Sequence, residues 1–148
     1  MISRSSSRTP ISSQAETERP KLRRVIAERG LCGLANDTKW DEFLTAMQTV
    51  FYSDGIWKPR FRFKRVDDVP CAWDADWYYH PDMIAVEWFD VSVLEETIEY
   101  RLPPKRTVTN HSAWLQQLLR RVGLEYQQGK TMIRIFGYSP KSYDLLDL

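Results

Sequence analysis

Residues 66–100 contain ten Asp and Glu residues and no Lys or Arg, although the chain of 148 residues has a net charge of only +1. Aromatic side chains are frequent among these acids: Trp73, Trp77, Tyr78, Tyr79, Trp88 and Phe89. Disordered acidic segments have few aromatic residues, so we expect this segment to be folded. Five basic residues in the eight positions from Lys58 to Arg65 come shortly before it. We therefore predict that the basic and acidic segments are neighbours in the folded protein.

Composition excludes several classes of protein. With 43% hydrophobic residues the chain can form a buried core, and with 28% charged residues it can cover that core with a polar surface. This composition argues against collagen-like, disordered and membrane-spanning proteins. Cys32 and Cys71 lie in no disulfide or zinc pattern, which favours reduced thiols in the cytoplasm. The six glycines form no phosphate-binding loop, and we expect no cofactor.

The chain divides by composition into three parts. Residues 1–19 are predicted to be a disordered tail rich in Ser and Arg, because their few apolar residues cannot offset the entropy lost on ordering. Residues 20–140 are predicted to form a single domain, followed by a C-terminal tail of residues 141–148. The N-terminus has no apolar run like that of a signal peptide, and no stretch is long enough to cross a membrane.

Hydrophobic spacing predicts the elements of the domain. Helices are expected at about residues 21–29, 38–51 and 110–122, and strands at about residues 60–65, 77–79, 83–93, 94–101 and 132–138. The second helix has the most regular pattern, with Trp40, Phe43, Leu44, Met47 and Phe51 on one face. This order predicts an α+β fold, with a mostly antiparallel sheet of about four or five strands and three helices on one face.

The densest polar cluster is the stretch from Trp73 to His80. Asp and His side chains are acceptable ligands for divalent cations, so Asp74, Asp76, His80 and Glu87 form a candidate metal site for a hydrolase or nuclease. In an extended strand Asp74, Asp76 and His80 would be spread over about 20 Å, so this site requires a bend or a ligand from the next strand, such as Glu87. In the alternative interpretation, Asp74 and Asp76 shape an Asx turn and pair with the basic segment, and His80 is hydrogen-bonded near the surface.

Other chemistry has less support. His80 and His111 are the only histidines, no nucleophile motif is present, and His111 fits a capping position at the third helix, so we predict no catalytic residue. Arg60, Arg62 and Lys64 alternate with aromatic residues as in some nucleic-acid-binding sheets. Strand alternation places these rings and charges on opposite faces, which argues against a nucleic-acid partner.

Several short motifs carry a family resemblance. They are Asn36-Asp37-Thr38-Lys39-Trp40, the stretch Trp73-Asp74-Ala75-Asp76-Trp77-Tyr78-Tyr79-His80, Val86-Glu87-Trp88 and Arg134-Ile135-Phe136-Gly137-Tyr138. Over about residues 20–138 the chain resembles a family of small bacterial proteins of unknown function. The resemblance implies a bacterial, intracellular protein and supplies no reaction or catalytic residue.

These observations favour a non-enzymatic protein-binding module, in which an acidic surface rich in tryptophan binds a basic protein partner. By analogy with other small acidic bacterial proteins, we expect an immunity protein that neutralises a toxin, or a regulatory protein. The predicted contact residues are Trp73, Asp74, Asp76, Trp77, His80, Glu87 and Asp90.

Overall fold

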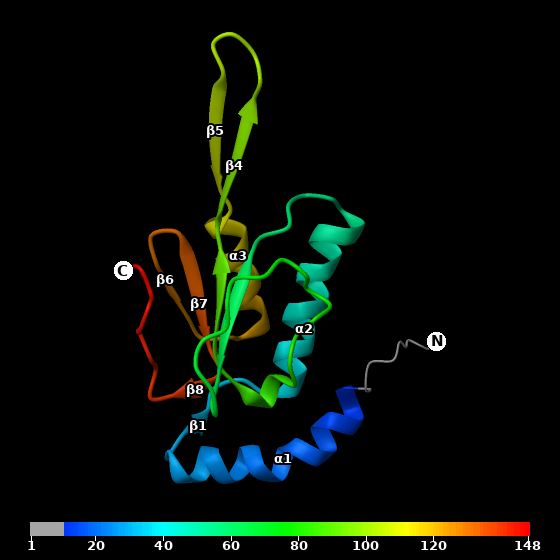
Figure 1. Ribbon diagram of the computed structural model, residues 1–148, viewed down its shortest axis with the longest axis vertical. Helices are drawn as coiled ribbons and strands as arrows, with labels where there is room; N and C mark the ends of the chain where they lie inside the picture. Colours follow the sequence, from blue (N-terminus) through cyan, green and yellow to red (C-terminus); the bar gives the residue numbers. More distant parts are fainter. Residues whose placement is uncertain (1–10) are drawn as a thin grey trace.

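A four-stranded antiparallel sheet of order β2-β3-β7-β6 forms the centre of the protein (Figure 1). Its strands are β2 (Phe61–Arg65), β3 (Val86–Ser92), β7 (Met132–Phe136) and β6 (Tyr126–Gln128). The computed structural model describes residues 11–148, with the side chains of residues 18–148. A short antiparallel pair, β1 (Cys32–Gly33) and β8 (Tyr138–Ser139), lies below the sheet. The predicted α+β class with antiparallel pairing is confirmed.

Two helices supply the apolar layer on one face of the sheet. Helix α2 (Asp37–Gln48) begins where the Asn36 side chain accepts a hydrogen bond from the Lys39 N–H at 2.9 Å, and a π-helical turn, η1 (Thr49–Ser53), continues it. Helix α3 (Ser112–Val122) ends at Gly123, which has a φ of +88°. Trp40 and Phe43 of α2 pack on Phe89, and Leu115, Leu118 and Leu119 of α3 belong to the same main core. The predicted periodicity of both helices is therefore confirmed.

Helix α1 (Ile11–Glu28) lies across the lower end of the sheet, away from the face that α2 and α3 cover (Figure 1). Its Leu22 packs in a second, smaller core with Val66, Ala85 and Tyr138. The helix begins at Ile11, upstream of the predicted boundary at residue 20. Arg19 donates to both carboxylate oxygens of Asp82 at 2.8 and 3.0 Å, a tertiary contact that spacing along the chain did not reveal. The rest of the predicted tail, residues 1–10, lies outside the described residues.

The segment after β3 forms a hairpin that projects away from the sheet (Figure 1). Its strands are β4 (Leu94–Glu99) and β5 (Lys105–Asn110), which pair antiparallel. The sequence predicted a strand at about residues 94–101, where β4 lies, but it assigned no element to most of the segment that forms β5. Pro103 and Pro104 lie in the connection between the two strands, and β4 and β5 form a two-stranded sheet of their own.

One predicted strand is absent from residues 11–148. Residues 77–79 form a turn instead of a strand, and a short 3-10 helix, η2 (Met83–Ala85), precedes β3. Gly137, between β7 and β8, permits a close approach of two backbones, because a Cβ at this position would lie 2.1 Å from the Val86 carbonyl oxygen. No helix in the described part of the chain is long and apolar enough to cross a membrane.

Candidate functional site

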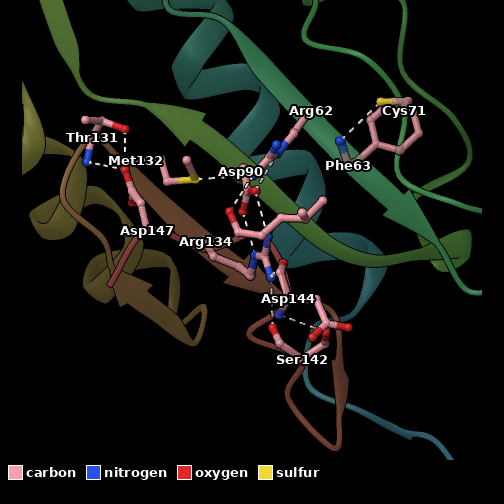
Figure 2. A network of polar contacts seen from close by, with 11 residues as sticks. Arg62, Phe63, Cys71, Asp90, Thr131, Met132, Arg134, Ser142, Asp144 and Asp147 are labelled. Atoms are coloured by element: carbon pink, nitrogen blue, oxygen red, sulfur yellow. Dashed lines mark hydrogen bonds and ion pairs between the residues drawn. The ribbon is translucent and has the colours of Figure 1, made fainter.

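A buried ionic network lies on the sheet face opposite α2 and α3 (Figure 2). Arg62, Asp90 and Arg134 are aligned across β2, β3 and β7, as the strand register requires. Arg134 donates to both Asp90 carboxylate oxygens, from Nε at 2.7 Å and from Nη2 at 2.9 Å. Arg62 Nε donates to the same carboxylate at 2.9 Å. Asp90 and Arg134 are 0% exposed, so this carboxylate is inaccessible to a partner.

The C-terminal segment covers this network. Arg134 Nη1 donates to the carbonyl oxygens of Ser142 at 3.0 Å and Asp144 at 2.6 Å, and Arg62 Nη2 donates to that of Leu145 at 2.9 Å (Figure 2). The two arginines thus supply hydrogen-bond donors to backbone carbonyl groups of a segment that has no regular secondary structure. Residues 141–148, predicted as a tail, therefore include contacts that belong to the core of the fold.

Glu87, like Asp90, is buried and bound by basic side chains. Its carboxylate accepts hydrogen bonds from Arg29 at 2.7 and 3.1 Å and from Lys64 at 2.8 Å, and the residue is 4% exposed. Burial raises the pKa of Glu87, but the hydrogen bonds and charges of Arg29 and Lys64 outweigh burial and hold the pKa below its usual range. The residue is therefore charged at neutral pH and fully occupied by two cations.

Trp77 is the third predicted contact residue that the structure places in the interior. It is 1% exposed and packs against the rings of Phe43, Phe51 and Phe61. Its indole Nε1 donates to the carbonyl oxygen of Pro59 at 2.9 Å. The sequence pattern placed Trp77 at a surface because acids surround it in the chain, but the turn directs the ring into the core.

The remaining predicted contact residues lie at or near the surface. Asp74 Oδ1 accepts from the backbone N–H groups of Ala75 at 2.6 Å and Asp76 at 3.1 Å, and Asp76 accepts from the Tyr78 N–H at 3.2 Å. These bonds confirm the predicted Asx turn. Figure 1 shows this stretch as part of the long loop between β2 and β3.

Trp73 and His80 flank this turn on either side. Trp73 is half-buried, and the Arg62 guanidinium lies 4.6 Å from the centre of its ring. His80 is also half-buried, with Nδ1 at 2.9 Å from the Pro81 carbonyl oxygen, as the structural alternative predicted.

Ion pairing divides the ten acids of residues 66–100 into two groups. Six have an Arg or Lys partner: Asp67, Asp82, Glu87, Asp90, Glu96 and Glu99. Glu95 is hydrogen-bonded to His111 at 2.8 Å. Within residues 18–148, the side chains of the other three, Asp68, Asp74 and Asp76, form hydrogen bonds only to backbone N–H groups of the loop. The predicted proximity of the basic and acidic segments is confirmed by Arg62, Lys64 and Arg65.

Two tyrosines add an aromatic element that the sequence interpretation did not include. Tyr52, at the end of η1, stacks on Tyr78 with ring centres 4.7 Å apart, and the two side chains are 43% and 52% exposed. Their separation in the sequence hid this pair. We call Asp68, Asp74, Asp76, Tyr52 and Tyr78 the acidic loop surface, because its free carboxylates all lie in the loop between β2 and β3.

The candidate metal ligands do not converge. Among the residues with described side chains, no group of three or more His, Cys, Asp or Glu residues could hold a metal ion. Asp74 and Asp76 bind backbone N–H groups of their own turn, whereas Glu87 binds Arg29 and Lys64 on another part of the molecule. This arrangement does not support the set Asp74, Asp76, His80 and Glu87 as a metal centre.

His111 has no nitrogen free for acid–base chemistry. Its Nε2 lies 2.8 Å from Glu95, and its Nδ1 accepts the Trp114 indole N–H at 2.8 Å, so the ring donates its proton to Glu95. Trp57 stacks on the imidazole with ring centres 4.2 Å apart. The residue occupies the predicted N-cap position of α3, but its side chain does not cap the helix. It binds Glu95 of β4 at the base of the hairpin instead.

Comparison with known proteins gives a family without an assigned activity. Residues 22–142 match the model of a family of unknown function (DUF6678), and the chain belongs to this family. The predicted resemblance to a family of unknown function is thereby confirmed. No curated protein and no solved structure matches the chain.

Proposed function

We propose that this protein is a non-enzymatic protein-binding module whose acidic loop surface contacts a basic surface of a partner protein. One observation carries the proposal: within residues 18–148, Asp68, Asp74 and Asp76 form no ion pair with Arg or Lys, whereas most other acids of the segment do. Of the three, Asp68 has a basic neighbour, because its charge helps to raise the pKa of Arg65. Unpaired carboxylates on one loop attract a basic partner and raise the rate of association. The stacked pair of Tyr52 and Tyr78 supplies aromatic area for the contact.

The competing functions fit the geometry less well. A hydrolase would need the dispersed carboxylates to meet at one ion. A nucleic-acid site on β2 would need several free cations, but two of the three candidates, Arg62 and Lys64, are bound to Asp90 and Glu87, which leaves Arg60 alone. We therefore retain the protein-binding function alone.

The form of this function that we propose is an immunity or regulatory protein of the cytoplasm. Both cysteines are free thiols, and Cys71 Sγ accepts a hydrogen bond from the Phe63 N–H at 3.3 Å. Free thiols accord with a reducing compartment. A small module with carboxylates free of ion pairs on one loop is suited to masking a basic surface of another protein.

The test removes charge without removing the turn. In the triple variant Asp68→Asn, Asp74→Asn, Asp76→Asn, each amide oxygen can still accept the backbone N–H bonds. The matched control is Glu28→Gln, Asp41→Asn, Glu42→Gln, which neutralises three exposed acids elsewhere on the protein. Full-length wild type and both variants are used to capture partners from the native host, and each captured protein is purified and titrated against all three.

We expect a basic partner that binds wild type and the control equally and binds the loop variant at least about tenfold more weakly, a loss of about 1.4 kcal/mol. The loss should shrink as the salt concentration rises, because salt screens exposed charges. A partner that binds the loop variant as tightly as wild type would contradict the proposal.

A further inference from the structure

The β4–β5 hairpin is the most exposed part of the described chain. All residues from Glu96 to Asn110 are exposed, including Ile98 at 42%, Tyr100 at 91%, Leu102 at 98% and Val108 at 52%. In Figure 1 the hairpin extends beyond the sheet and helices, without another element beside its outer part. Isolated two-stranded ribbons are marginally stable in water, so a hairpin of this kind gains from an added neighbour.

The hydrogen bonds at the base of the hairpin show which backbone groups are free. The His111 N–H donates to the Val93 carbonyl oxygen at 2.8 Å, and this pair continues the register of Leu94 with Asn110. In an antiparallel ladder, hydrogen-bonded pairs alternate with pairs that are not hydrogen-bonded. The odd-numbered residues of β4 therefore bond to β5, and the N–H and C=O groups of Glu96 and Ile98 point to the free edge.

The free edge of β4 lies on the β2 side of the sheet. The Ser92 N–H donates to the Arg60 carbonyl oxygen at 2.9 Å, whereas the Val93 N–H donates to the Thr131 carbonyl oxygen, next to β7, at 3.0 Å. Even-numbered residues that continue this strand therefore point to the β2 side. Because β2 begins at Phe61, the outer part of β4 has no strand beside it at this position (Figure 1).

The charges of the hairpin indicate what kind of strand β4 accepts. Glu95, Glu96 and Glu99 lie in its six residues, which include no base. On its paired edge, β4 already has a basic neighbour: Glu99 lies opposite Lys105, and Glu96 forms an ion pair with Arg106. These glutamates stand on the two faces of the strand, where a neighbour on either edge can reach them. Exposed ion pairs of this kind are weak, so the glutamates of β4 can also interact with the basic side chains of a second neighbouring strand.

We infer that the free edge of β4 binds an extended basic segment of a partner protein as an additional antiparallel strand. Main-chain bonds to Glu96 and Ile98 supply affinity, and the glutamates select Lys or Arg in the segment. The inference rests on the proposed function, which supplies the basic partner. It adds that the bound segment of this partner is an extended strand.

A second copy of this chain does not fit as the occupant of this edge. If β5 of a second copy lay antiparallel to β4, both hairpins would point the same way. The two molecules would then be displaced by only two strand spacings, about 10 Å, and their helical layers would overlap. Pairing β4 with β4 of a second copy would instead add glutamates to glutamates.

The test uses the chain's own basic strand as the probe. Full-length protein labelled with ¹⁵N is titrated with the peptide Lys-Arg-Thr-Val-Thr-Asn, the sequence of β5, to about 5 mM, a range that detects weak complexes. Amide hydrogen exchange is measured for both outer edges of the hairpin. We expect exchange at Glu96 and Ile98 to slow about tenfold at 90% occupancy, while exchange at Arg106 and Val108 is unchanged. The charge-reversed peptide Glu-Glu-Thr-Val-Thr-Asn should have no effect.

Two proline variants form a matched pair. Ile98→Pro removes an N–H from the free edge of β4, and Val108→Pro removes the equivalent N–H from the free edge of β5. Neither N–H takes part in the β4–β5 ladder, and proline is tolerated at such positions of edge strands. We expect Ile98→Pro to abolish the exchange protection at Glu96 and Val108→Pro to retain it.

Protection at Arg106 and Val108 instead of β4, equal effects of both peptides, or no protection of the wild type at 5 mM would overturn the inference. A peptide that perturbs only Asp68 to Tyr78 would leave the proposed function standing and reject the β4 edge. Conversely, if the acidic loop surface proved unnecessary for capturing a partner, the peptide could still protect Glu96 and Ile98. Failure of the proposed function and failure of the β4 edge therefore give different results.

Discussion

Asp90 and Asp74 belong to the same acidic segment, but their surroundings differ in every respect. Asp90 is 0% exposed and bound by Arg62 and Arg134, whereas Asp74 is exposed and accepts only backbone N–H groups of its own turn. Removing one partner of a buried ion pair leaves an uncompensated charge, but neutralising an exposed acid leaves its solvation largely unchanged. Acids of one segment therefore divide into buried carboxylates that hold the fold together and exposed carboxylates that pair with no base of residues 18–148.

The largest effect is expected from Asp90→Asn. This change leaves the buried Arg134 and the half-buried Arg62 without their counter-charge and should lower the free energy of unfolding by about 3 to 5 kcal/mol. Equilibrium denaturation in urea measures the loss, provided that the slope with denaturant is unchanged. A loss below about 1 kcal/mol would break the distinction between buried and exposed acids.

A double-mutant cycle sharpens this prediction. In Asp90→Leu, Arg134→Met, the buried Arg134 charge is removed together with the Asp90 carboxylate, and only Arg62 is left without its counter-charge, so the double variant should be more stable than Asp90→Leu alone. The C-terminal segment loses the donors for Ser142 and Asp144, so some loss relative to wild type remains. If the double variant were no more stable than the single one, the ion pair itself would not explain the cost.

Glu87→Gln tests a buried acid with partly exposed partners. The Arg29 side chain is 38% exposed, so solvent screens its pairing, and we expect a loss of about 1 to 2 kcal/mol at pH 7. Since the folded pKa of Glu87 is lowered from 4.5, its contribution is complete above pH 4.5 and is lost as the pH falls through the folded value. Stability curves of wild type and variant should therefore converge below pH 4.5. Parallel curves down to pH 2 would contradict this.

Periodicity and charge predicted the parts of the fold in which neighbours along the chain determine structure. The spacing of Trp40, Phe43 and Met47 predicted α2, and the alternation from Arg60 to Arg65 correctly separated inward rings from outward charges. The charge pattern also predicted the proximity of β2 to the acids.

Tertiary contacts explain what the sequence did not predict. Trp77 was assigned to a surface because neighbouring acids do not reveal that a turn directs its ring into the core. The C-terminal segment has no periodicity, and only Arg62 and Arg134, distant in sequence, hold its carbonyl groups. Strand β5 consists of polar and exposed residues, so no apolar alternation marked it. For the acidic loop surface, Asp74 and Asp76 were identified, but Asp68, Tyr52 and Tyr78 required the structure.

Asp147 provides an intermediate case, because its carboxylate accepts backbone N–H bonds as Asp74 does, but from another segment. It accepts from Lys130 and Thr131 at 2.9 Å and also from the Thr131 hydroxyl (Figure 2). Asp147→Ala leaves these donors to water and loosens the C-terminal segment, so we expect a loss of about 1 kcal/mol by urea denaturation. Asp144→Ala, an exposed acid of the same segment, is the control and should change stability by less than about 0.5 kcal/mol. If both variants lost the same free energy of unfolding, the hydrogen bonds of Asp147 would not stabilise the C-terminal segment.

The smallest effect on stability is expected from Asp74→Asn, Asp76→Asn. The amide oxygens can still accept the bonds from Ala75, Asp76 and Tyr78, and no ion pair is broken, so the free energy of unfolding should change by less than about 0.5 kcal/mol. Asp74→Ala, Asp76→Ala serves as the contrast, because alanine cannot accept these bonds and should cost about 1 kcal/mol more. Thermal and urea unfolding of both variants measure the difference. If the Asn variant lost as much stability as Asp90→Asn, these acids would be structural, and the acidic loop surface would have no charge reserved for a partner.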